Sequence, residues 1–109
     1  MNKSNLSNLD AVLTSTDKAK GLPNQHYVSQ EVFEEEKQAI LFDNWSAIGT
    51  GKDIPNPGDV KPINFLGMPL IIVRDSDSNI NVFQNTCRHR GMILINEPTN
   101  IEGVIRCPY

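Results

Sequence analysis

Two cysteines and one histidine near the end of the sequence constrain the fold more than any other feature. Cys87 and His89 are separated by one residue, and Cys107 follows His89 after 17 intervening residues. That interval is long enough for one strand, a turn and a returning strand, so the loops that carry these side chains are expected to lie side by side. Two thiols and an imidazole on adjacent loops form a donor set suited to a metal.

The residues from 45 onward have the sequence pattern of a β domain. Short β-like runs alternate with turn-forming residues, a pattern typical of a small antiparallel sandwich or barrel. Trp45 is expected to fill the core where a preceding helix meets the sheet, and Asn79 is expected to take a left-handed conformation in a turn. The expected strands are 45–48, 60–65, 70–74, 80–84, 92–95 and 103–106.

A helix is expected before this β domain, from Ser29 as its N-cap to about Asp43. The run Glu34–Glu36 is interpreted as a solvated face, because consecutive helical residues point in different directions and cannot converge on one ion. The apolar face of this helix is expected to comprise Val32, Phe33, Ala39 and Ile40.

Residues 1–25 carry only a weak helical stripe and are interpreted as a short amphipathic helix or a loose arm. The stripe consists of Leu6, Leu9 and Leu13. The predicted organisation is therefore an N-terminal arm and helix over residues 1–44, followed by a β domain over residues 45–109.

Length and charge exclude several classes of function. A chain of 109 residues is one domain or less, and its net charge of −3 argues against nucleic-acid binding. Its apolar runs are too short to span a bilayer, and the N-terminus lacks the apolar stretch of a secretory signal. A cytoplasmic location is expected, where paired cysteines more often bind metal or do redox chemistry than form a disulfide.

The sequences Cys87–Arg88–His89–Arg90–Gly91 and Cys107–Pro108–Tyr109 together resemble the Rieske iron–sulfur motif. The sequence around them is similar to that of the large (alpha) subunit of Rieske non-haem iron oxygenases. That family includes ring-hydroxylating dioxygenases and the choline-monooxygenase-like and carnitine-oxygenase-like enzymes. The likeness covers about residues 27–109, and it implies a Rieske-type antiparallel β-sandwich or barrel domain with an N-terminal helix, truncated in its second cluster-binding loop.

The resemblance implies a [2Fe–2S] cluster in which Cys87 and Cys107 bind one iron and His89 binds the other. Neutral imidazoles in place of thiolates raise the reduction potential of such a cluster. A histidine directly after Tyr109 would complete the ligand set, so the sequence is expected to continue in the full reading frame.

The resemblance also implies weaker roles for the flanking residues. Gly91 is expected to let the backbone turn close to the cluster, and Pro108 to stiffen the second loop. Either arginine of the first loop, Arg88 or Arg90, is expected to offset cluster charge, or else to form surface ion pairs. Tyr109 is expected either to hydrogen-bond near the cluster or to be a frayed end.

By the same resemblance, the full-length protein is expected to be the oxygenase component of a multicomponent system. Electrons would arrive from a reductase or ferredoxin and pass through the [2Fe–2S] cluster to a mononuclear Fe(II) in a downstream domain. That iron would use O₂ to hydroxylate a small organic substrate, aromatic or quaternary amine, and the fragment alone would be inactive. A homotrimer, or an assembly with a small beta subunit, is implied.

Other interpretations stay open at this point. The same ligands suit a Rieske ferredoxin that only carries electrons, although the long segment before Trp45 favours an oxygenase subunit. A zinc site is a further alternative, for which His26 is the only spare imidazole, although a surface-loop position is expected for it. The two thiols could also be buried and inert, in a domain that binds partners without any cluster.

Overall fold

The computed structural model describes residues 9–109, which divide into two compact units at the boundary between Ser46 and Ala47. The leucine stripe of the N-terminal arm therefore lies partly outside the described residues. From residue 9 to residue 23 the chain forms turns and bends and no helix, and Leu13 is 77% exposed. No helix in the described part of the chain has the length and apolar character needed to cross a membrane.

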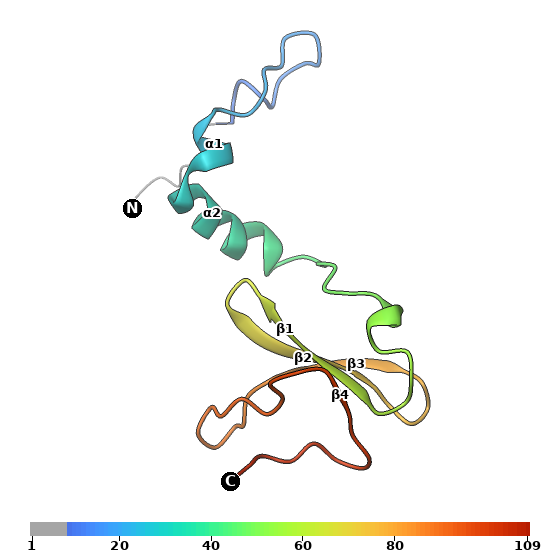
Figure 1. Ribbon diagram of the computed structural model, residues 1–109. Coiled ribbons are helices and arrows are strands. Elements are labelled where there is room, and N and C mark those ends of the chain that lie inside the picture. Colours follow the sequence, from blue (N-terminus) through green and yellow to red (C-terminus); the bar gives the residue numbers. More distant parts are fainter. Residues whose placement is uncertain (1–8) are drawn as a thin grey trace. The chain divides into compact units, whose positions relative to one another are not determined.

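The first unit contains three short helical pieces, of which the second and third form the helix expected after Ser29 (Figure 1). These are α1 (Gln25–Val28), α2 (Gln30–Glu36) and the π-helical segment η2 (Lys37–Leu41). Ser29 is the N-cap of α2, as predicted, because its Oγ accepts a hydrogen bond from the Val32 N–H at 3.3 Å. The side chain of Asn44 donates to the Ile40 carbonyl at 2.8 Å and so satisfies one of the acceptors left at the helix end.

Two predictions for this unit are wrong. The expected apolar face is not buried as a whole, since Val32 is buried while Phe33, Ala39 and Ile40 are exposed. Trp45 is fully exposed and belongs to no strand, so it does not fill a core. The physical reason is local: residues 45–50 form no sheet pairing that would fix the ring against a neighbour.

The second unit is built on an antiparallel sheet of order β3-β2-β1-β4. Its strands are β1 (Asp59–Phe65), β2 (Met68–Arg74), β3 (Ile80–Gln84) and the short β4 (Thr99–Asn100). The mainly β, antiparallel fold class is confirmed. A 3₁₀ turn, η3 (Gly51–Asp53), precedes β1 and is held by a capping box between Thr50 and Asp53.

The predicted hairpin between β1 and β2 is confirmed, with Leu66 and Gly67 as its two turn residues. Both have positive φ values, 54° and 92°, which match the right-handed twist of the flanking strands. In the next turn, Ser78 rather than Asn79 takes the left-handed conformation. Asn79 instead donates its backbone N–H to Asp75 Oδ1 at 2.8 Å, as part of an Asx-type turn.

The segments 92–95 and 103–106 are not the strands that the pattern predicted. Only an isolated bridge between Thr86 and Ile93, and the two-residue β4 on the edge of β1, are formed. Leu94, Ile95 and Ile105 of these segments pack on the core of the sheet instead of pairing in strands, while Val104 is exposed. Val60, Ile71 and Ile95 form the buried core, and Val73, Leu94, Ile101 and Ile105 pack around it.

The core predicts a clear contrast between two isoleucines of neighbouring strands. Ile71 is 2% exposed, so Ile71→Ala should lower the free energy of unfolding by about 2–5 kcal/mol, because it leaves a cavity in the centre of the sheet. Ile80 is 48% exposed, and Ile80→Ala should cost under about 1 kcal/mol. Urea unfolding of the two variants measures the difference, and equal losses would contradict this placement of the core.

Candidate functional site

The first cysteine loop follows β3 directly and is closed by backbone hydrogen bonds. The Cys87 N–H donates to the Met92 carbonyl at 2.7 Å, and the Gly91 N–H donates to the Cys87 carbonyl at 2.8 Å. Arg88, His89 and Arg90 form the turn between these two points. The loop thus projects three polar side chains from a short, internally hydrogen-bonded hairpin.

The structure brings the two thiols together, as the spacing predicted. Both cysteines are free and half-buried, which does not fit the alternative of fully buried, inert thiols. The backbone N–H of His89 is the main cause of a lowered pKa of the Cys87 thiol, and a hydrogen bond with the Cys107 side chain adds to it. The backbone N–H of Arg90 also lowers this pKa, while partial burial opposes the shift. These contacts therefore stabilise the thiolate of Cys87 relative to that of an unperturbed cysteine, and the thiolate is the form that binds metal.

His89 lies on the same turn as these donors, but its side chain is exposed. Within residues 9–109, no three His, Cys, Asp or Glu side chains gather closely enough to ligate one metal ion. The alternative of a mononuclear zinc site therefore finds no ligand group in this part of the chain. A two-iron cluster has a different requirement, because its cysteine and histidine ligands bind different irons.

His26, the other histidine, does not lie in a surface loop as expected. It belongs to helix α1 in the first unit, and its Nε2 is buried without a hydrogen-bond partner. The cysteines belong to the second unit.

Gly91 adopts a left-handed conformation with φ of +69° at the end of the first loop. A Cβ at this position would meet no atom of the chain within 4 Å. Backbone conformation, rather than crowding by the chain, is therefore what favours glycine here.

The four remaining predicted site residues, Arg88, Arg90, Pro108 and Tyr109, are all exposed. The ion pairs found among the described residues join Lys37 to Glu34 and Lys61 to Asp53, so neither arginine of the first loop is neutralised by an acidic side chain there. Tyr109 is 93% exposed.

Asn85 is the residue of this region that the sequence analysis missed. It is 3% exposed, and its Nδ2 donates to the Ile95 carbonyl at 2.7 Å. Its Oδ1 accepts the N–H groups of Leu94 at 3.2 Å and Ile95 at 2.9 Å. An asparagine directly after a predicted strand is typical of an ordinary turn, so no sequence signal distinguished Asn85 from other turn residues.

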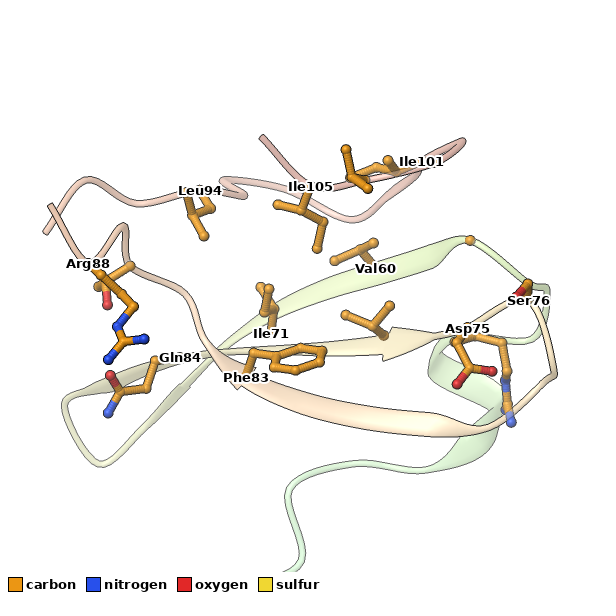
Figure 2. A pocket seen from close by; sticks show the side chains of 16 residues that line it. Val60, Ile71, Asp75, Ser76, Phe83, Gln84, Arg88, Leu94, Ile101 and Ile105 are labelled. Atoms are coloured by element: carbon orange, nitrogen blue, oxygen red, sulfur yellow. The ribbon is translucent and has the colours of Figure 1, made fainter. Parts of the chain in front are cut away.

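A cleft of ≈ 820 Å³ lies between the sheet and the segment 94–105. Figure 2 shows Ile71 and Phe83 on the sheet side and Leu94 and Ile105 opposite them. Arg88 reaches over one end of the cleft, near Gln84. The walls are largely apolar, with Asp75 and Arg88 among the lining residues.

Comparison with protein families places the second unit clearly. The family model for the Rieske [2Fe-2S] domain matches residues 44–109. The carnitine monooxygenase oxygenase subunit of Acinetobacter pittii (strain PHEA-2) is 36% identical over 93 residues, which cover 85% of this chain and 25% of that protein. The salicylate 5-hydroxylase large oxygenase component of a Ralstonia species is 35% identical over 89 residues, 81% of this chain and 21% of that protein.

A solved structure shares the fold as well. The crystal structure of the quaternary ammonium Rieske monooxygenase CntA with γ-butyrobetaine aligns with a TM-score of 0.73 at 33% identity. The alignment covers 94% of this chain and 28% of that one. The chain thus spans about a quarter of the length of the relatives that it matches.

The donor set fits a [2Fe–2S] cluster of the Rieske kind. Two adjacent thiols suit one iron, the imidazole of the same loop is exposed and available to a second, and backbone N–H groups of the loop are directed at sulfur. Hydrogen bonds to sulfur are a general means of tuning such clusters.

The left-handed turn at Gly91 predicts a cost for any side chain there. Gly91→Ala should lower the free energy of unfolding by about 1–2 kcal/mol, because the Cβ then approaches the following carbonyl oxygen. Gly91→Asn should lose less, since asparagine tolerates this conformation. Gly21→Ala is the control, because Gly21 has open space and no positive φ. Thermal unfolding compares the three, and a Gly91→Ala variant as stable as Gly21→Ala would refute the assignment.

Proposed function

This chain belongs to the Rieske [2Fe-2S] domain family, and on that premise we propose that it is the electron-relay part of an oxygenase large subunit. Residues 45–109 form the Rieske domain in this proposal, and residues 1–44 are the arm and helix that lead into it. The observation that carries the proposal is the close approach of the Cys87 and Cys107 thiols, beside the turn that presents His89.

In this proposal Cys87 and Cys107 hold one iron and His89 holds the other. The bound cluster accepts and releases one electron at a time. The backbone N–H groups of His89 and Arg90 stabilise negative charge at the Cys87 sulfur. A histidine directly after Tyr109 would supply the second imidazole of the ligand set in this proposal.

The exposed arginines of the first loop are proposed to offset negative charge that the cluster gains on reduction. Arg88 and Arg90 are both exposed, and no described acidic residue pairs with them. Exposed cations near a redox centre act through a screened field, so their effect on the potential is modest and depends on ionic strength. Pro108 restricts the backbone directly after Cys107 and limits the motion of the second ligand loop.

The whole protein is proposed to be an oxygenase component served by a reductase or ferredoxin. A mononuclear Fe(II) beyond this chain would use O₂ to hydroxylate a small organic substrate. Quaternary ammonium compounds are the first substrates to test, because several similar proteins are named for carnitine or glycine betaine. Aromatic acids come next, from the salicylate hydroxylase. A homotrimer, or an assembly with a small beta subunit, goes with this function.

A Rieske ferredoxin that only carries electrons is the less favoured alternative. The similar proteins are oxygenase subunits, and the alignment to the carnitine monooxygenase subunit covers 85% of this chain, more than the Rieske domain alone.

A cytoplasmic location accords with two free thiols, since cytosolic reductants keep cysteines in that state.

The two histidines of the chain provide a matched test of the cluster. The full-length protein should contain iron and acid-labile sulfide in about 2:2 proportion. His89→Ala should lose most of both, because one iron then lacks its imidazole from this loop, whereas His26→Ala should keep them. Elemental analysis and the electron paramagnetic resonance (EPR) spectrum of the reduced protein measure the outcome. Zinc without sulfide in the wild-type protein, or equal cluster content in the two variants, would overturn the proposal.

A further inference from the structure

Asn85 stands where both ends of the first cysteine loop meet. Its backbone N–H donates to the Pro69 carbonyl at 2.9 Å, which fixes the residue to the beginning of β2. Its side chain bonds the main chain of Leu94 and Ile95, on the far side of the loop. One residue therefore connects the outgoing strand, the returning segment and the sheet.

The side-chain amide uses both of its functional groups in this position. Oδ1 accepts two N–H groups and Nδ2 donates to a carbonyl, so the orientation of the amide is determined by its partners. The side chain is almost completely buried, at 3% exposure. Removing it would leave two N–H groups and one carbonyl without that partner, and buried polar groups without partners are strongly disfavoured.

The remaining contacts of the loop lie between the Asn85 hydrogen bonds at its base and the turn at its tip. The bridge between Thr86 and Ile93 comes next, followed by the hydrogen bond from Cys87 to Met92. Each depends on the strand and the returning segment being held in register, which the Asn85 amide does from the base. Ile95 is itself part of the buried core, so the returning side of the loop is also tied to the sheet.

We propose that Asn85 is a positioning residue for the ligand loop, which holds Cys87 and His89 in place by fixing Leu94 and Ile95 across the loop base. Asn85 does not bind iron in this proposal. Before any cluster is present, it holds the first loop, and with it Cys87, against the core on which Ile105 also packs, two residues before Cys107. The inference rests on the proposed function for the identity of the ligands, but the loop geometry can be measured without the cluster.

A control asparagine is available at the opposite edge of the sheet from β3. Asn100 in β4 donates to the Pro57 carbonyl at 3.0 Å and to Asp59 Oδ1 at 2.9 Å. Asn100→Ala therefore removes side-chain hydrogen bonds that hold an edge strand, and it leaves the loop base unchanged. Asn85→Asp is a second variant, nearly equal in size to the native residue, that keeps the acceptor oxygen and loses the donor to Ile95.

The first measurement uses the full-length protein freed of metal. Equilibration with reduced and oxidised glutathione, followed by peptide mapping, gives the effective concentration of the Cys87–Cys107 thiol pair. Asn85→Ala should lower this concentration about tenfold or more, and Asn85→Asp should lower it less. Asn100→Ala should stay within about twofold of wild type. An unchanged value for Asn85→Ala and Asn85→Asp, or an equal fall for Asn100→Ala, would overturn the proposal.

The second measurement uses the cluster-loaded protein. Asn85→Asp should shift the reduction potential and the g values of the reduced cluster, while Asn100→Ala should keep both at wild-type values even if its melting temperature falls. Identical spectra and potentials in the two variants would count against a positioning role. If the wild-type protein binds no cluster, the proposed function fails, and the glutathione measurement still decides the role of Asn85.

Discussion

The packing of the segment 94–105 on the sheet is the contact on which the rest of the second unit depends. Ile95 enters the buried core beside Val60 and Ile71, and Ile101 and Ile105 pack around the same cluster. Burying an isoleucine of this kind is favourable by about 1.5–3 kcal/mol. Since Cys107 lies two residues beyond Ile105, this apolar contact returns the second cysteine to the first. The proximity of the two thiols is therefore a consequence of core packing.

Polar contacts then fix the position of the returning segment relative to the first cysteine loop. A hydrophobic cluster is non-directional and cannot by itself fix two sulfur atoms relative to each other. The backbone hydrogen bonds of the first loop and the buried amide of Asn85 supply the direction. At the other end of the sheet, Arg74 has a comparable role, since its guanidinium donates to the carbonyls of Gly51, Ile54 and Ser78. Both ends of the sheet are thus held by buried or half-buried side chains that bond to main chain.

Main-chain dipoles contribute to the electrostatics of the first cysteine loop. Backbone N–H groups directed at Cys87 lower the pKa of its thiol without placing a fixed positive charge beside it. Such dipoles stabilise a thiolate moderately, so they favour metal binding and still permit the charge to change on reduction. The cationic side chains of the loop remain at the surface.

Several features of the structure could be predicted from the sequence. They are the hairpin of β1 and β2, strand β3, the Ser29 N-cap and the proximity of the two cysteine loops. These features depend on local patterns: alternation of apolar residues, turn residues with positive φ and the spacing of ligands. The prediction of strands at 92–95 and 103–106 was wrong. A short apolar run has the same sequence pattern whether it pairs within a sheet or packs on the face of one. The exposed position of Trp45 was missed for a related reason, since a large aromatic ring in a sequence does not reveal what covers it.

The sequence by itself determined which atoms are available for chemistry and roughly how far apart they lie along the chain. It contained the thiols, the imidazole and the left-handed glycine, since residue type fixes donor chemistry and backbone freedom. Only the tertiary structure decided how these groups meet, because burial of Ile95 and the bonds of Asn85 join residues that are distant or unremarkable in sequence. Hydrogen-bond satisfaction in a core is a property of three-dimensional neighbours, and no local pattern encodes it.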